Sequence, residues 1–222
     1  MTLAQLIARF RTEANDQAVP YFCSDADVTA WLNDAVNEAC IRARLIHESS
    51  NETVTKITVV AGTAVYALHA SLYELDHIRF VDEDDNSNAV RLVSTEWLDG
   101  NVMSEWRAWA GTPQYAVQTD KHIRLVPKPD IAGSVMMEGY RLPITAMSQG
   151  TDTPEIHAEH HRHLVHWALH QGFSIPDSEF FDKDRSAKAE AAFTQYFGLR
   201  PDADLRRITR EDVPQHVEAF WP

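Results

Sequence analysis

The first residues of the chain alternate apolar and polar side chains with the period of an α-helix. This pattern predicts a short helix that ends before Pro20. Its apolar positions are Leu3, Leu6, Ile7 and Phe10. The charges that interrupt the pattern are not typical of a secretory signal or a transit peptide, so we expect this helix to belong to the folded domain.

A second and stronger helical pattern runs from Ser24 to about Ile46. Ser24 is a suitable N-cap, and Asp27 stands three positions later, as in a capping box with Asp in place of Glu. Apolar residues then follow in steps of three and four: Val28, Trp31, Leu32, Ala35, Val36, Ala39, Cys40 and Ala43. The opposite, polar face is predicted to carry Asn33, Asp34, Asn37, Glu38 and Arg42.

From about residue 52 the period changes to two, which predicts strands. β-Branched and alternating residues fill the segments 53–62, 74–84 and 89–93, and turn residues separate them. A short helix at 94–101 follows, with Ser94 or Thr95 as its cap. The segment 111–143 then predicts three short antiparallel strands with turns near 119–121 and 127–133, because its prolines would disrupt a parallel sheet.

Helical period returns after Pro154. One helix is predicted to end near Gly172, and a second from about residue 177 to 197 with Gly198 as its C′ residue. The first is marked by Ile156, His160, Leu164, Trp167 and Ala168; the second is expected to bury Phe180 or Phe181, Ala187 or Ala189, Ala192, Phe193 and Tyr196. Residues 199–222 contain three prolines and no sustained period.

These elements together predict an α+β fold. N- and C-terminal helices form a bundle, a small antiparallel β subdomain is inserted between them, and an extended arm follows at the C-terminus. The 222 residues suit one domain with an appendage. We therefore expect a single domain at 1–198, with helical parts at 1–48 and 152–198 and a β insertion at 52–146, followed by an arm at 199–222.

The charge balance excludes one broad class of function. Acidic residues outnumber basic ones by 33 to 20, for a net charge of −13. Proteins that grip nucleic acid do so by neutralising phosphates with Lys and Arg, so tight, extended binding is not expected. No stretch approaches the roughly 20 apolar residues of a membrane span. The 2 cysteines, Cys23 and Cys40, cannot form a disulfide framework, which favours folding in a reducing cytoplasm.

Histidines are concentrated in the predicted helix after Pro154. Six of the 11 lie between His157 and His170, and the pairs His157/His161 and His166/His170 have the i,i+4 spacing that can place two metal ligands on one helix face. The zinc-hydrolase motifs are absent, however, and no third ligand is indicated. Histidines that cap, pair with Glu155 and Glu159, or line a subunit contact are the favoured interpretation.

Other catalytic signatures are missing as well. Cys23 precedes a helix N-terminus, where a thiolate is favoured, but no catalytic motif surrounds it and a packed thiol is the better interpretation. The chain has no Gly-x-Ser-x-Gly elbow and no glycine-rich phosphate loop. The acidic residues 82–85 lack the ligand spacing of a calcium loop and are expected to form a solvated turn. We therefore predict no catalytic residue, no metal and no cofactor.

Aromatic residues suggest contacts with other chains. Trp97, Trp106 and Trp109 crowd beside the segment 111–113, where some could pack under the β subdomain and others could anchor an interface. Phe220 and Trp221 end a polar, proline-punctuated arm that offers little to bury them. An arm of this kind is expected to dock in a groove on another chain.

The order of these segments resembles the head-to-tail adaptor (connector) proteins of tailed bacteriophages. The resemblance covers most of residues 1–198. It is carried by Trp-Leu-Asn in the first long helix, by Gly-Thr-Pro-Gln-Tyr followed by Leu-Val-Pro-Lys-Pro, and by a late Ala/Phe-rich helix that ends in Phe-Gly. The histidine density of the segment 157–170 has no counterpart in this family pattern.

The resemblance implies a virion protein that forms a ring, typically dodecameric, beneath the portal. Such a ring extends the DNA channel, lets genomic DNA pass without specific binding, and presents a platform to a tail or nozzle protein. A negative net charge suits this role because acidic walls do not trap a phosphate backbone. The implied location is the neck of the virion, after assembly in the host cytoplasm, with no membrane partner.

The resemblance also assigns candidate contact residues. The arm is expected to reach the portal through apolar anchors and arginines: Leu205, Arg206, Arg207, Ile208, Arg210, Val213, Val217, Phe220 and Trp221. A closed ring needs two different complementary faces on each subunit. Our candidates for these faces are the polar face of the helix after Ser24 and the histidine-bearing helix, with Asp34, Glu38, Arg42, His157 and His161 as contact residues.

Two alternatives stay open at this point. One is another neck protein, such as a tail-completion or stopper protein, with the same chemistry and a different neighbour. The other, from a different functional class, is a metal-dependent hydrolase built on the segment His157–His170.

Overall fold

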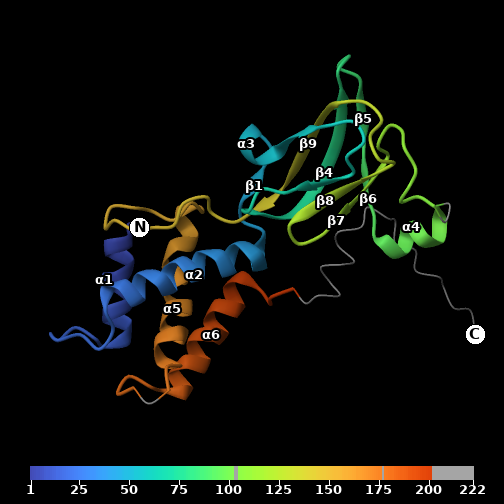
Figure 1. The fold of residues 1–222 in the computed structure, drawn as a ribbon. Helices are drawn as coiled ribbons and strands as arrows, with labels where there is room; N and C mark the ends of the chain where they lie inside the picture. Colours follow the sequence, from blue (N-terminus) through green and yellow to red (C-terminus); the bar gives the residue numbers. More distant parts are fainter. Residues whose placement is uncertain (103–104, 177, 202–222) are drawn as a thin grey trace, which may run out of the picture. The chain divides into compact units, whose positions relative to one another are not determined.

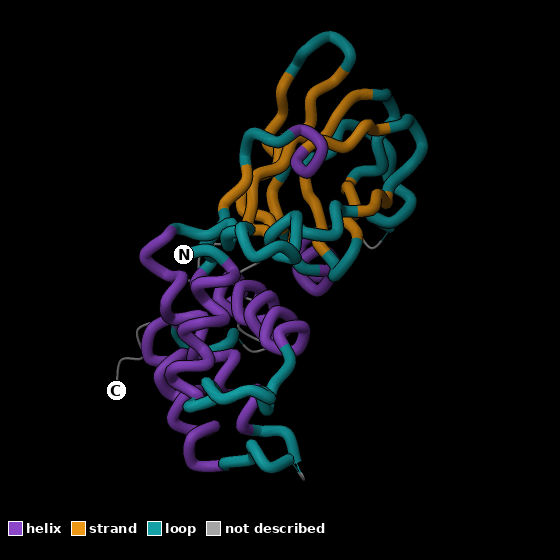
Figure 2. The backbone as a smooth tube through the Cα atoms, turned by 90° about the vertical axis from the view of Figure 1, so that its left-hand side faces the viewer, coloured by secondary structure: helices purple, strands orange, loops and turns teal. Residues whose placement is uncertain are grey.

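The computed structural model describes residues 1–102, 105–176 and 178–201, and these form two compact units. A helical unit comprises Met1–Ile46 and Leu142–Pro201, and a β unit comprises the inserted residues His47–Arg141. Figure 1 shows the order of the elements, and Figure 2 shows helices and strands gathered separately. The predicted α+β class is confirmed. The predicted arm contacts from Leu205 to Trp221 lie outside the described residues.

Local capping explains where the first two helices begin and end. In α1 (Leu3–Ala14) the Thr2 hydroxyl accepts from the Gln5 N–H, while the Gln5 side chain accepts from the Thr2 N–H. In α2 (Asp25–Ala43) the predicted N-cap Ser24 accepts from the Asp27 N–H at 3.1 Å. Both helices end in a residue with left-handed backbone, Asn15 and Arg44.

The C-terminal helices differ from the prediction at their starts. The segment Ala158–His163 is a 3₁₀-helix, η1, and the α-helix α5 covers only Leu164–Phe173. The last helix, α6 (Lys183–Phe197), begins six residues later than predicted, because Asp182 accepts from the N–H groups of Asp184 and Arg185 and caps the helix there. Phe180 and Phe181 therefore belong to the loop before α6.

α5 lies at the centre of the helical unit and packs against α1, α2 and α6. One continuous core joins these helices, and its largest fully buried side chains are Leu6, Phe10, Leu32, Leu164 and Phe193. Apolar area removed from water contributes about 25 cal/mol per Å², so burial of these side chains stabilises the unit. No helix among the described residues is long and apolar enough to cross a membrane.

The β unit contains two sheets. The first has the order β1-β9-β4-β5, with β2 also paired to β9; the second has the order β3-β8-β7-β6. The strands are β1 (His47–Glu48), β2 (Lys56–Val59), β3 (Val65–Ala67), β4 (Leu72–Asp82), β5 (Ser87–Ala89), β6 (Arg91–Leu92), β7 (Tyr115–Gln118), β8 (His122–Val126) and β9 (Gly133–Arg141). Two short helices accompany them, α3 (Glu52–Thr55) and α4 (Thr95–Asn101).

Three strands were predicted within residues 111–143, and three are present there, but they do not form one sheet. β7 and β8 pair with each other, whereas β9 pairs along its length with β4 in the other sheet. Gly139 permits this close pairing because it has no side chain: a Cβ there would lie only 2.3 Å from the Glu74 carbonyl oxygen. β6 pairs with β7 in parallel. The alternation of apolar and polar residues does not reveal the relative direction of two strands.

The two sheets share one core. Ile78, Phe80, Val135 and Met137 from the first sheet and Ala116, Ile123 and Leu125 from the second belong to the same buried cluster. A smaller cluster of Val93, Leu98, Trp106, Val117 and Val126 packs α4 and the following segment onto the second sheet. Each unit thus has its own hydrophobic core.

Candidate assembly interfaces

Of the five residues predicted to meet a neighbouring subunit, two are exposed. Asp34 lies on the outer face of α2, and His157 is the N-terminal cap of η1, where its Nδ1 accepts from the Glu159 N–H. The side chains of Glu38, Arg42 and His161 are buried within the helical unit. As contacts between subunits the five residues remain a prediction.

Glu38 and Arg42 form a link between α2 and the end of α6. Arg42 Nε donates to Glu38 Oε1 at 2.8 Å, and Nη1 donates to Thr194 Oγ1 at 2.9 Å. The guanidinium lies over the rings of Trp167 and Phe193, with 5.1 and 5.2 Å to the two centroids. The prediction that Glu38 and Arg42 lie on a solvent-facing polar side is therefore wrong, because packing against α6 covers that part of α2.

His161 is occupied inside its own unit. Its Nε2 lies 2.9 Å from the Ile156 carbonyl oxygen, and Nδ1 lies 2.7 Å from the Met1 amine. Because residues 158–163 form a 3₁₀-helix with three residues per turn, His157 and His161 do not share one face as they would on an α-helix. Among the described residues, no group of three His, Cys, Asp or Glu side chains is placed to hold a metal ion.

Two histidines of this segment hold Tyr196 of α6. His163 stacks on the Tyr196 ring with 3.5 Å between centroids, and His160 Nδ1 lies 3.1 Å from the Tyr196 hydroxyl. Burial lowers the pKa of both imidazoles, and the side chains of His157 beside His160 and Arg162 beside His163 lower it further. Both rings therefore favour the neutral form, which suits their role in packing η1 and α5 against α6.

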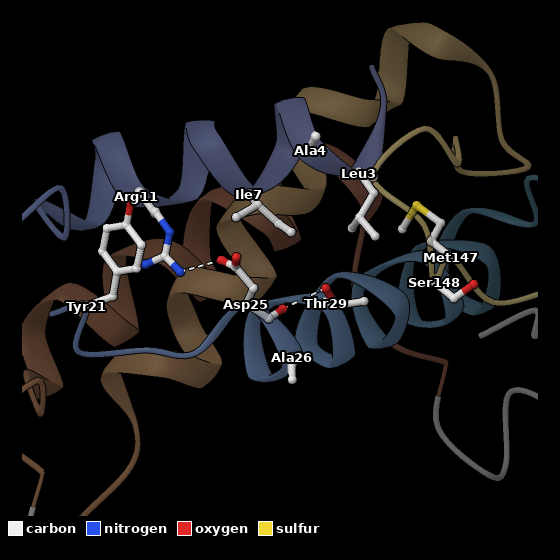
Figure 3. Close-up of a pocket in the computed structure, with 11 residues that line it drawn as sticks. Leu3, Ala4, Ile7, Arg11, Tyr21, Asp25, Ala26, Thr29, Met147 and Ser148 are labelled. Atoms are coloured by element: carbon white, nitrogen blue, oxygen red, sulfur yellow. Dashed lines mark hydrogen bonds and ion pairs between the residues drawn. The ribbon is translucent and has the colours of Figure 1, made fainter. Parts of the chain in front are cut away.

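An open groove of about 780 Å³ lies between α1 and α2 (Figure 3). We call it the α1–α2 groove; its lining residues are Leu3, Ala4, Ile7, Arg11, Tyr21, Asp25, Ala26, Thr29, Met147, Ser148 and Gly150. Most of these side chains are apolar or small. The loop carrying Met147 is fixed to α2 by Asn33, whose amide exchanges two hydrogen bonds with the Met147 backbone.

Arg11 lies at one end of the groove and is paired with two carboxylates. Its guanidinium donates to Asp16 Oδ2 at 2.8 Å and to the Cys23 carbonyl oxygen at 3.1 Å, and it pairs with Asp25. The Tyr21 ring covers it, with 3.5 Å from Arg11 Cζ to the centroid. Burial, and after it Asp16, raises the pKa of the nearby Cys23 thiol to about 11, so this side chain is a packed thiol.

Four large apolar side chains form an exposed patch on two loops of the helical unit, which we call the aromatic tip. They are Val19 (79% exposed), Phe22 (61%), Ile175 (42%) and Phe181 (50%). The loops join α1 to α2 and α5 to α6, and both extend beyond the helices in Figure 1. Phe22 stacks on Phe180 with 6.0 Å between centroids, so the loops lie side by side. Exposed apolar side chains on two adjoining loops are candidates for an interaction surface.

The aromatic tip was missed at the sequence level. Phe22 lies in a short loop between Pro20 and Ser24, and the helical period predicted before residue 197 assigned Phe180 or Phe181 to a buried face. The position of Phe22 and Phe181 in the sequence could have indicated their exposure. Each lies between a proline and a helix N-cap, where no helix face is present to bury a large apolar side chain. The loops meet only through tertiary packing, which the pattern does not contain.

The three tryptophans of the β unit differ in burial. The sequence had left open which of them pack under the sheet and which are exposed. Trp106 is buried, and its Nε1 donates to Asp99 Oδ1 at 2.8 Å. Trp97 is partly buried and packs beside Tyr115, with 5.3 Å between ring centroids. Trp109 is exposed, so it is the tryptophan of the three that is free to meet another chain.

Comparison with known proteins shows the family of this chain. No curated protein matches the chain. A family model described as SU10 adaptor protein matches residues 1–218, which covers both units and most of the C-terminal segment. The suspected resemblance to phage adaptors is thereby confirmed. The chain belongs to the SU10 adaptor protein family, a family of structural phage head–tail adaptors.

Proposed function

We propose that this chain is a head-to-tail adaptor that forms a ring beneath the portal, extends the DNA channel and offers a platform to the tail. The observation that carries the proposal is the family match over residues 1–218. Its place in the virion is then the neck, and its partners are the portal on one side and a tail or nozzle protein on the other.

The surface of the helical unit supports a ring. Subunits in a closed ring make heterologous contacts, so each must carry two different faces that match. The helical unit exposes two candidate surfaces, the aromatic tip and the α1–α2 groove, and Tyr21 of the tip loop lines the groove.

The charge supports passage of DNA without retention. With 33 acidic and 20 basic residues the chain is strongly negative, so a ring of many copies repels the phosphate backbone. The DNA channel therefore needs no base contacts. We expect purified rings to leave the mobility of a double-stranded DNA fragment unchanged at physiological salt.

The C-terminal arm is the proposed portal contact. Its apolar residues and arginines, from Leu205 to Trp221, offer anchors and charge pairing to another chain. Among the described residues, the core of the helical unit ends at Phe197, so we expect a chain that ends at Gly198 to fold.

A truncation separates portal binding from folding. The full chain, a chain ending at Gly198 and a Phe220→Ala/Trp221→Ala variant are each mixed with the portal, and electron microscopy records whether a ring adds to it. We expect the full chain to add a ring and both altered chains to lose it while their far-UV circular dichroism stays that of a folded protein. A truncated chain that binds the portal normally contradicts the assignment of the arm.

The same experiment tests the nearest alternative. A chain that ignores the portal but assembles on a tail tube is a tail-completion protein, and the proposal of a portal ring is then wrong. Chains that stay monomeric with both partners contradict the ring itself.

A further inference from the structure

We propose that Glu38, Arg42 and Gly198 fix the direction in which the chain leaves α6, and that this direction presents the C-terminal arm to the portal. We call these three residues the arm base. The inference rests on the proposed function, because it names the residues that position the proposed portal contact. They are positioning residues, which act on the portal only through the arm.

Gly198 turns the chain at the end of α6. Its N–H donates to the Thr194 carbonyl oxygen at 2.8 Å, and its φ of 89° with a ψ of 177° then directs the chain out of the helix. Residues with a Cβ rarely adopt this pair of angles, so the turn requires glycine. A Cβ at Gly198 would meet nothing within 4 Å. The requirement therefore concerns the backbone conformation and not the space around it.

Arg42 holds the backbone on the far side of this turn. Its Nη1 donates to the Gly198 carbonyl oxygen at 3.3 Å and to Thr194 Oγ1 at 2.9 Å. An arginine from α2 thus caps the C-terminal end of α6, where the helix dipole favours a positive charge. The Arg42 side chain is only 6% exposed and donates from Nε to Glu38. The donor is therefore fixed, and the Gly198 carbonyl group must come to it.

Glu38 extends the arm base two residues further along the chain. Its Oε1 accepts from Arg42, while its Oε2 lies 3.8 Å from Nη1 of Arg200. Arg200 is largely exposed, so this ion pair is weak by itself. Its position gives it a role, because it adds a second contact beyond the turn at Gly198. A chain that contacts α2 at residues 198 and 200 leaves α6 in one direction.

A fixed direction at the start of the arm favours binding by the rest of it. Ordering a chain segment on a partner costs conformational entropy, and a segment that already starts in the bound direction loses less of it. The arm base therefore makes the arm a better ligand without adding a contact to the portal. Disturbing the arm base should weaken portal binding while every residue of the arm is kept.

Gly198→Ala in the full chain is the sharpest variant, because it removes no side-chain contact. The alanine disfavours the observed backbone angles, so we expect portal binding to weaken about 10-fold. Gly62→Ala is the matched control: Gly62 also has a positive φ, 82°, and open space around its Cα, but it lies in the β unit. Surface plasmon resonance on immobilised portal measures the affinities, and Gly62→Ala should bind as the wild type does.

Glu38→Gln is a second variant, which tests the ionic part of the arm base. It removes the charge that attracts Arg200 and keeps the shape of the side chain, so we expect a smaller loss of portal affinity, about 3-fold. Glu190→Gln, at an exposed carboxylate of α6, is its control and should leave the affinity unchanged. Far-UV circular dichroism verifies that each variant is folded.

A second measurement follows the direction of the chain in the absence of the portal. Spin labels at Ala30→Cys and Leu199→Cys, both at exposed positions, report the distance from α2 to the first residue after the turn. The two native cysteines are buried and should not be labelled. By double electron–electron resonance we expect one narrow distance distribution with the native arm base and a broader or shifted one with Gly198→Ala.

The two measurements separate the possible failures. Portal affinities of Gly198→Ala and Glu38→Gln equal to that of the wild type overturn the inference, and so does an equal loss for Gly62→Ala. An unchanged distance distribution in Gly198→Ala overturns it as well. A wild type that does not bind the portal contradicts the proposed function instead, and the distance distributions still decide whether the arm base fixes the direction of the chain.

Discussion

Arg11 is the residue whose loss we expect to harm the helical unit most directly. It is buried, and it neutralises the carboxylate of Asp16, which is only 1% exposed. Arg11→Met should lower the free energy of unfolding by about 3 kcal/mol, because it leaves a buried carboxylate without its cation. Urea unfolding followed by circular dichroism measures the change.

Arg9→Met is the matched control on the same helix. Arg9 pairs with Glu13 at the surface of α1, and an exposed i,i+4 pair contributes less than about 0.5 kcal/mol. Equal losses for Arg9→Met and Arg11→Met would show that the buried network around Asp16 does not stabilise the fold.

At the scale of residues, the sequence predicts those features that depend only on neighbouring residues in the chain. The cap at Ser24 follows from its own position before an apolar period, and it is confirmed. The burial of Glu38 and Arg42 depends on Thr194 and Phe193, more than 150 residues away in the chain, so no helical period could indicate it. The same holds for His161 and its bond to the Met1 amine.

At the scale of elements, the packing of η1 and α5 against α6 should depend on pH. His160 and His163 have pKa values lowered from 6.5, mainly by burial, so the folded state favours their neutral forms. Their contribution is present above about pH 6.5 and is lost as the pH falls through the lowered values. We expect a melting temperature several degrees lower at pH 5.5 than at pH 7.5.

The His160→Gln/His163→Phe variant tests the origin of this loss. A phenylalanine keeps the stacking on Tyr196 and cannot be protonated, so the difference in melting temperature between the two pH values should shrink. His122→Gln, an exposed histidine of the β unit, is the control and should leave the difference as it is. A variant with an undiminished difference would assign the pH dependence to other groups.

Elements were predicted best where one hydrophobic period continues along the whole element. α2 and the three strands after residue 114 follow their patterns closely. The 3₁₀ segment Ala158–His163 was read as α-helix, because its apolar positions also fit the period of α5. The division of strands between two sheets was not predicted, since alternation gives the face of a strand and not its partner.

At the scale of the whole molecule, two separate cores predict two acid transitions. In the β unit, burial by itself raises the pKa of Glu48. Hydrogen bonds from the Asn51 and Ser50 N–H groups and from Arg141 outweigh that effect and lower the pKa from 4.5 to about 2. The stability from this carboxylate is present above about pH 4.5 and is lost as the pH falls towards 2. The helical unit contains His160 and His163, so as the pH falls it should lose stability at a higher pH than the β unit does.

The indole N–H signals of Trp31 and Trp106 report the two units separately in two-dimensional NMR. During acid titration we expect the Trp31 signal to lose its folded position at higher pH than Trp106. Glu48→Gln should reduce the acid sensitivity of Trp106 alone, and Glu83→Gln, at an exposed turn, should change neither. Simultaneous loss of both signals in every variant would contradict independent units.

The family could be anticipated from the order of segments, and the exposed surfaces of the helical unit could not. Element order and a few phrases sufficed for the family, which the match over residues 1–218 confirms. In the aromatic tip Phe22 stacks on Phe180, and in the α1–α2 groove Leu3 and Met147 both line the wall; both pairs are distant in sequence. Surfaces assembled in this way exist only after folding.

The strands at the two ends of the β unit lie beside each other. β1 pairs antiparallel with the end of β9, His47 opposite Tyr140 and Glu48 opposite Gly139, and the buried Glu48–Arg141 ion pair fastens them. The chain therefore leaves the helical scaffold at Ile46 and re-enters it at Leu142 through neighbouring backbones, about 5 Å apart. A segment with such adjoining ends is a cassette: we expect that another module with adjoining ends can be grafted in its place while the scaffold keeps its path.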